Sequence, residues 1–340
     1  MGQQASTEQI LVAWRALANG HDGQGWRTIP VKVNLPCPVM AGRCFPGGEE
    51  ALLIGFDSVS PPHREQMPSG RGFTVRLEDI EVGAARQRWF SLHRLAAGNL
   101  QMFATMVTDV LATLEREAAL REAGLFQAFL RRVKAWQSFM QRDQEGALSP
   151  EEEVGLFGEL LFMERLAGTR LDRMAIVQAW MGPLDALQDF QFERGAIEVK
   201  ASLDTGRFPA TVSNLDQFDD GIRSPLFLAA VRLRLSDTGL TLAGQVDALK
   251  ALLADDPTAL AAFENRLLQA GYVEAQAGLY VRRFSPVDER LFHVHGDFPR
   301  LARRSLTSAI LDARYRIDID LVPAVYEIGL TGALSLIGAE

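Results

Sequence analysis

The chain has 340 residues, of which 47% are hydrophobic and 23% charged, and its formal net charge at pH 7 is −8. This composition is that of a globular protein and excludes a disordered chain. The acidic balance argues against a protein that coats nucleic acid by electrostatics alone. No apolar run is long enough to cross a bilayer, and two cysteines, Cys37 and Cys44, favour neither a disulfide framework nor a zinc site. We therefore expect a cytoplasmic protein without membrane contact.

Four segments can be distinguished along the chain. Residues 1–95 contain short apolar or alternating runs at 52–56, 72–77 and 89–92, separated by Gly, Pro and Ser clusters, which predict short strands in a small β-rich N-terminal domain. Residues 96–147 carry two amphipathic patterns at helical spacing and predict a helical connector. We expect residues 148–240 to form the core of the second half and residues 241–340 to pack on this core as a C-terminal α/β portion.

The second half is predicted to be mixed α/β. A capping box of Ser149 and Glu152 opens a helix over residues 151–166, and the residues around 175–180 are also helix-like before Gly182 breaks the pattern. Further helices are expected over 241–253 and 257–270, and strands over 189–192, 196–201, 210–213, 225–235, 272–284, 291–295 and 314–321. Residues 149–340 hold 19 basic and 28 acidic side chains, a surplus of carboxylates that fits a metal-dependent site better than a bare phosphate clamp.

A strand with charges at its centre indicates where such a site would lie. In the strand that ends at Ser202, alternation directs the apolar side chains to one face and Glu198, Lys200 and Ser202 to the other. The turn at 193–195 suits a hairpin that brings Asp189 opposite Glu198, with Cβ atoms roughly 5 Å apart. Two carboxylates so close repel unless a proton or a cation lies between them. Mg²⁺ is the simplest choice, because one or two carboxylates commonly hold it.

Lys200 is one of only four lysines among the 35 basic residues. A lysine beside a metal ligand can orient or deprotonate a water, because its pKa falls when it is buried or crowded by cations. A glutamate two positions before a lysine is nevertheless a common chance pattern. A purely structural hairpin with an incidental Glu-x-Lys is therefore an alternative, and it predicts no response to metal.

Asp189, Glu198 and Lys200 together have the form of the PD-(D/E)XK nuclease motif, although Gln188 stands where the motif usually has proline. The surroundings resemble a family of bacterial proteins that carry this motif. The matching stretches are GLFGELLFMERL (155–166), WMGP (180–183), DFQFERGAIEVKAS (189–202), VSNLDQF (212–218) and HGDFPRL (295–301).

This resemblance implies an α+β (mixed α/β) fold whose restriction-endonuclease-like core is a mixed four-stranded sheet flanked by helices. It also implies hydrolysis of DNA phosphodiester bonds with Mg²⁺, or with Mn²⁺ as a substitute, in a restriction-like or anti-phage defence setting. Glu159 then completes a metal site with Asp189 and Glu198, and Lys200 acts with them as a catalytic residue. Glu159 lies on the apolar stripe of its helix, where a buried glutamate needs a partner.

Three further residues are candidates for substrate binding. Gln217 could orient Lys200 or contact the phosphate backbone, but a helix-capping loop with Ser213 or Asn214 as the cap is an equal alternative. We therefore treat Gln217, Asn214 and Ser202 as candidates for substrate binding. For Ser202 a structural role of the hydroxyl group is the alternative.

Two clusters near the C-terminus have competing interpretations. His293 and His295 share a strand face, as in a zinc site, but the sequence offers no evident third ligand. Arg300, Arg303 and Arg304 could meet a DNA backbone or form surface ion pairs.

The leading hypothesis is a metal-dependent DNA endonuclease. The alternative is a catalytically weak or inactive nuclease-fold subunit that binds or positions DNA within a defence complex. The chain has no P-loop, so translocation along DNA would require a partner ATPase, and a methyltransferase is a second partner that such a system would use. Cleavage of both strands of a duplex would favour a homodimer.

Overall fold

The computed structural model describes residues 6–18, 24–60, 67–82, 85–141, 147–203, 206–307 and 309–339. The chain divides into two compact units, unit 1 (Met1–Glu145) and unit 2 (Gly146–Glu340). None of the helices in these ranges combines the length and the apolar character needed to cross a membrane.

Unit 1 is built on a five-stranded antiparallel sheet with the order β1-β2-β3-β5-β4. The sequence predicts strands near β3, β4 and β5, whereas β1 and β2 are not predicted. Every residue of β1 is half-buried or exposed, so its sequence lacks the apolar alternation that marks a half-buried strand. The strands are β1 (Gly25–Pro30), β2 (Val39–Phe45), β3 (Glu49–Ile54), β4 (Phe73–Val82) and β5 (Ala85–Arg94).

Three helices, α1 (Thr7–Ala18), α2 (Leu100–Arg116) and α3 (Glu122–Gln141), belong to the same unit as this sheet. The indole of Trp14 in α1 donates a hydrogen bond to the Ala51 carbonyl in β3 (3.0 Å). The ring of Phe126 in α3 lies 4.6 Å from that of Phe90 in β5, centroid to centroid. The segment expected to be a connector therefore packs on the sheet, because its helices bury their apolar faces there.

Unit 2 contains a mixed four-stranded sheet with the order β10-β9-β7-β6, which confirms the predicted fold class. The two central strands, β7 and β9, run parallel, and the outer pairings are antiparallel. A separate two-stranded ribbon pairs β8 with β11. The strands are β6 (Phe190–Gln191), β7 (Ala196–Ser202), β8 (Pro209–Val212), β9 (Leu226–Leu240), β10 (Phe284–His293) and β11 (Tyr315–Asp318).

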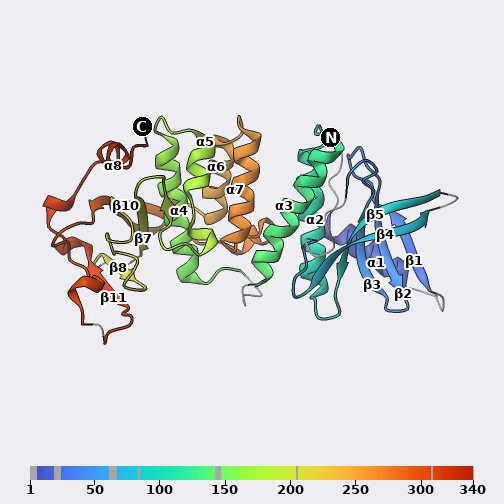
Figure 1. The fold of residues 1–340 in the computed structure, drawn as a ribbon, viewed down its shortest axis with the longest axis horizontal. Helices are drawn as coiled ribbons and strands as arrows, with labels where there is room; N and C mark the ends of the chain where they lie inside the picture. The colour runs from blue at the N-terminus through green and yellow to red at the C-terminus, as the bar shows by residue number, and fades with distance from the viewer. Residues whose placement is uncertain are drawn as a thin grey trace. The chain divides into compact units, whose positions relative to one another are not determined.

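The helices of unit 2 include four that lie together in Figure 1, α4 (Pro150–Ala167), α5 (Arg173–Ala179), α6 (Leu242–Leu252) and α7 (Pro257–Gln269). A short helix, α8 (Leu330–Ile337), follows near the C-terminus. The predicted capping box of α4 is confirmed: Ser149 and Glu152 exchange hydrogen bonds of 2.8 and 3.3 Å between side chain and backbone.

The strand expected over 272–284 is wrong. A 3₁₀ helix of six residues, Glu274–Leu279, lies within this range, and β10 begins only at Phe284. Two of the residues that suggested a strand, Tyr272 and Tyr280, are buried and form a stacked pair of rings whose centroids are 5.6 Å apart. Core packing of these rings, rather than pleating, therefore accounts for part of the pattern.

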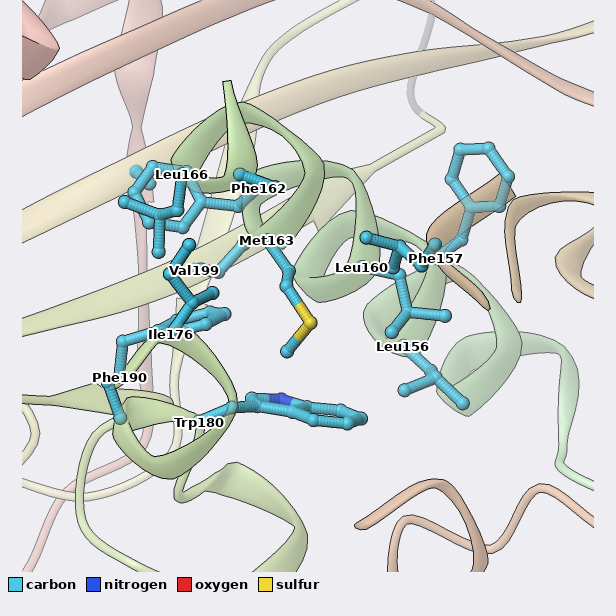
Figure 2. Packing of buried hydrophobic residues seen from close by; sticks show 14 of the residues in the cluster. Leu156, Phe157, Leu160, Phe162, Met163, Leu166, Ile176, Trp180, Phe190 and Val199 are labelled. Atoms are coloured by element: carbon cyan, nitrogen blue, oxygen red, sulfur yellow. The ribbon is translucent and has the colours of Figure 1, made fainter. Parts of the chain in front are cut away.

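Strand β7 divides its side chains between two cores. Ile197 and Val199 join the core that contains the apolar residues of α4, part of which is shown in Figure 2. Ala196 joins a second core together with residues of β8 and β11. Because alternate side chains of a strand point to opposite faces, Glu198 and Lys200 lie on the face of Ala196. This alternation is the one that the sequence predicts.

Helix α4 can approach β7 closely only because residue 158 is glycine. A Cβ at Gly158 would lie 2.5 Å from the Cβ of Ala201. We expect Gly158→Ala to lower the free energy of unfolding by about 1–3 kcal/mol through overpacking. Gly155, on the same helix, has no heavy atom of the described chain within 4 Å of its Cβ position, so Gly155→Ala should stabilise by about 0.5–1 kcal/mol. Urea denaturation of both variants checks this, and equal effects would contradict the close approach.

Candidate active site

A cleft of about 920 Å³ in unit 2 collects most of the predicted site residues. Residues of α4, β7, β8 and β11 contribute to its lining, together with the loop that follows β8. The acidic lining residues are Glu151, Glu159, Asp189 and Glu198, and the basic ones are Lys200, Arg282, Arg314 and Arg316.

The side chain of Asp189 is hydrogen-bonded to the backbone of β7. The β6–β7 register pairs Phe190 with Ile197, and its continuation brings Asp189 opposite Glu198, as the hairpin predicts. The Oδ2 atom of Asp189 accepts a hydrogen bond of 2.7 Å from the backbone N–H of Val199. Burial is the main cause that raises the pKa of Asp189. The carboxylate thus takes the place of a strand partner just before β6 begins.

Glu198 is almost fully buried, with 2% of its surface exposed. Its Oε1 atom accepts hydrogen bonds from Lys200 Nζ (2.6 Å) and Gln217 Nε2 (3.0 Å). Its Oε2 atom is buried and has no hydrogen-bond partner in the described part of the chain. Burial, and next the charge of Asp189, raise the pKa of Glu198 to about 8. A buried carboxylate oxygen without a partner is a position that a cation would stabilise.

Lys200 is charged in this environment. Burial lowers its pKa, but Glu198, Asp189 and Glu159 together outweigh burial, so that the pKa rises above its ordinary value. A lysine crowded by cations would have a lowered pKa, but Lys200 is surrounded by carboxylates instead. The side chain is therefore a hydrogen-bond donor that can orient a water, rather than a base.

Glu159 has a partner that the sequence analysis did not identify. Its Oε2 atom accepts a hydrogen bond of 2.7 Å from the indole Nε1 of Trp180. Burial, and next Asp189, hold the pKa of Glu159 well above its usual range. The ring of Trp180 is fully buried in the core beside α4 (Figure 2). Trp180 thus combines an apolar ring in the core with a polar N–H at the site.

Gly182 provides the space in which two carboxylates meet. A Cβ at this residue would lie 2.9 Å from Asp189 Oδ1 and 3.0 Å from Glu159 Oε2. The backbone N–H of Gly182 also donates a hydrogen bond of 3.0 Å to the Asp189 carbonyl. The stretch WMGP carried the resemblance, but no role was assigned to it. The only sequence feature that could have indicated a role for this stretch is a tryptophan and a glycine shortly before the strand that carries the acidic residues.

Replacing Trp180 by phenylalanine tests this contact. Trp180→Phe keeps an aromatic ring in the core and removes the N–H that Glu159 accepts. We expect the free energy of unfolding to fall by about 1–3 kcal/mol, because a buried acceptor loses its donor. A double-mutant cycle with Glu159→Leu, which removes the acceptor, measures the coupling. Additive effects would show that the two side chains do not interact.

Gln217 and Asn214 have different roles in the loop after β8. Gln217 lines the cleft and bonds Glu198, and its Oε1 atom accepts from the Ser213 backbone N–H (2.8 Å). Asn214 is outside the cleft lining, and its Oδ1 atom accepts from the backbone N–H groups of Asp216 and Gln217, each at 3.0 Å. Asn214 therefore caps the turn that positions Gln217.

Two neighbouring polar residues belong to the same part of the site. Ser202 lines the cleft and is buried. Gln188, which stands in place of the motif's proline, is also buried and donates a hydrogen bond of 3.3 Å to the Gln217 carbonyl. Gln188 thus links the strand that carries Asp189 to the loop that carries Gln217.

The two C-terminal clusters lie apart from the acidic residues of the cleft. The rings of His293 and His295 are 4.4 Å apart. Arg303 and Arg304 form ion pairs with Asp216 and Asp220, at 2.5 and 2.7 Å. Arg300 also pairs with Asp220, at 2.8 Å. These ion pairs hold the loop that carries Gln217.

The mixed sheet, with an aspartate and a Glu-x-Lys at the end of a short hairpin, is the arrangement that defines PD-(D/E)XK proteins. The chain matches the model of the family described as "Putative PD-(D/E)XK family member, (DUF4420)" over residues 10–320, and it belongs to that family. No significant match was found among curated proteins or among solved structures.

PD-(D/E)XK nucleases generally use divalent metals, and the residues of this cleft fit such an ion. Among the described residues no three His, Cys, Asp or Glu side chains are already grouped as metal ligands. Mg²⁺, however, is usually held by one or two carboxylates together with waters. Glu198 offers a buried Oε2 that has no partner among the described residues, and Asp189 lies beside it in the hairpin. Burial is the main cause that raises the pKa of both carboxyls, and a bound cation would offset the cost of ionising them there.

Proposed function

We propose that this protein is a metal-dependent endonuclease that hydrolyses DNA phosphodiester bonds, in the restriction-like or anti-phage defence setting that the family resemblance implies. The observation that carries the proposal is the buried set of Asp189, Glu198 and Lys200 in one cleft, with Glu198 Oε2 free of any described partner. A purely structural hairpin has no use for an unpartnered carboxylate oxygen that faces a cleft.

Each residue has a defined task in this proposal. Asp189 and Glu198 would hold Mg²⁺, which when bound polarises a phosphate and lowers the pKa of water. Lys200, kept protonated by its carboxylate neighbours, donates a hydrogen bond that orients the attacking water. Gln217 fixes the rotamer of Glu198 through its 3.0 Å hydrogen bond. Glu159, held by Trp180, places a further carboxyl group beside Asp189, where a bound cation would favour its ionised form.

The direct test is incubation of the purified chain with plasmid DNA and with single-stranded DNA. Cleavage is expected with Mg²⁺ or Mn²⁺ and should stop when EDTA is added. Unchanged DNA in every divalent-metal condition would count against an enzyme that acts alone.

A second candidate is a catalytically weak subunit that binds DNA within a larger complex. It is favoured by the ion pair of Lys200 with Glu198 and by the lack of a pre-grouped three-ligand metal site among the described residues. A partner ATPase or methyltransferase, or a second copy of the chain, would then complete the activity. DNA binding without cleavage in the plasmid assay would support this candidate over the first.

A further inference from the structure

The β8–β11 ribbon carries two arginines on the side of the cleft. Arg316 lies in β11, where it pairs with Thr211 of β8, and both residues line the cleft. Arg314 directly precedes β11 and lines the cleft as well. Figure 1 shows β8 and β11 together in unit 2, away from the group of α4 to α7. Both arginines are exposed.

The core beneath the ribbon determines which way Arg316 faces. Its neighbour Ile317 is buried in the core that it shares with Ala210 of β8. Because alternate residues of a strand point to opposite faces, the side chain of Arg316 points away from that core. The ribbon therefore presents positive charge to the cleft from a backbone that the core holds in place.

These arginines differ from two other basic residues of the cleft, which have ion-pair partners within the described part of the chain. Lys200 is paired with Glu198 at 2.6 Å, and Arg282 with Glu153 at 2.6 Å. In the parts of the chain that the structure describes, neither Arg314 nor Arg316 lies within salt-bridge distance of an acidic side chain. The positive charge available to a ligand in this cleft is thus concentrated on the ribbon.

We propose that Arg314 and Arg316 bind backbone phosphates of a DNA strand that enters the cleft. The planar guanidinium presents paired N–H donors that match two phosphate oxygens, and its charge persists at every physiological pH. A strand held on the ribbon would bring a neighbouring phosphate to Asp189 and Glu198. The location of that neighbouring phosphate rests on the proposed nuclease function, whereas the phosphate contacts themselves do not require cleavage.

Salt-dependent DNA binding in EDTA tests this proposal without cleavage. Fluorescence anisotropy of a labelled duplex, and of one of its single strands, gives the slope of log K against log salt concentration. Each phosphate contact contributes about 0.9 to that slope for duplex and about 0.7 for a single strand. We expect the double variant Arg314→Ala/Arg316→Ala to reduce the slope by up to two such contacts and to weaken binding at low salt.

Two further variants separate charge neutralisation from other effects. Arg234→Ala removes an exposed arginine of β9 outside the cleft lining, so it should leave the slope unchanged. Arg314→Lys/Arg316→Lys keeps both charges and should restore the slope of the wild type. The proposal is overturned if the double alanine variant keeps the wild-type slope, if Arg234→Ala reduces it equally, if lysine fails to restore it, or if the wild type binds neither DNA. If the wild type shows these phosphate contacts but does not cleave DNA, the nuclease proposal is refuted and the phosphate-binding proposal is not.

Discussion

Lys200→Ala is expected to reduce metal-dependent cleavage of DNA by about 10²–10³-fold, the range seen when one preorganised hydrogen-bond donor is removed from an active site. In the proposed mechanism the charged ammonium would be the donor that orients the attacking water, and alanine leaves no group in its place. Rates of plasmid nicking with Mg²⁺, compared at equal protein concentration, measure the effect. Asp189→Asn should be equally damaging because it removes a carboxylate charge from the metal site while preserving an acceptor for Val199 N–H.

A surface lysine supplies the matched control. Lys250 is bonded to Glu274 at 2.5 Å, away from the cleft, so Lys250→Ala should cleave at the wild-type rate. Loss of Lys200 leaves the buried Glu198 without its cation, and circular dichroism together with the unfolding temperature must show that the variant is folded. If folded Lys200→Ala and folded Asp189→Asn both cut as fast as the wild type, the site assignment is wrong.

The metal-free protein is expected to lose stability as pH rises from about 4.3, the ordinary value for glutamate, to about 8, the pKa of Glu198 in the folded chain. A raised carboxyl pKa means that the folded state binds the proton more tightly than the unfolded state in this window. The free energy of unfolding therefore falls with pH, by at most about 1.4 kcal/mol per pH unit for this group. Chemical denaturation at a series of pH values measures the slope.

Divalent metal should reverse this loss. An ion that binds only the folded state adds about 2.7 kcal/mol when its concentration is 100 times its Kd, and ionised carboxylates at pH 8 bind it best. Glu198→Gln is expected to remove both the pH slope of this group and the stabilisation by Mg²⁺ or Mn²⁺. Glu274→Gln, at an exposed position, should preserve both. A wild type that is equally stable with and without metal at pH 8 would instead support the structural-hairpin alternative.

Local patterns explain why part of the site could be predicted. The alternation in β7 and the short glycine-ended turn bring Glu198 and Asp189 together across only a few residues, and the positive φ of Gly195 (77°) fits that turn. The capping box at Ser149 is equally local. Such features depend on backbone geometry over one turn or one hairpin, and that geometry is encoded in adjacent residues.

Contacts between distant residues could not be predicted in this way. The partner of Glu159 lies 21 residues away at Trp180, and the partner of Glu198 lies 19 residues away at Gln217. The stacked pair of Tyr272 and Tyr280 imitated a strand because core packing can produce an apolar pattern in any element. Each of these contacts depends on how whole helices, strands and loops pack against one another. The spacing of residues within a short segment carries no information about that packing.

Neighbouring residues were enough to predict the capped helix α4, the shared face of Glu198 and Lys200, and the motifs that carry the family resemblance, because periodicity and short motifs are local properties. The mixed sheet of unit 2 was expected from that resemblance. The charge state of Lys200 depends on the three-dimensional structure, since three carboxylates from different elements together raise its pKa. The same is true of the Glu198 oxygen that has no partner among the described residues and of the arginines on the β8–β11 ribbon, because burial and cleft lining arise only when segments remote in the chain pack against one another.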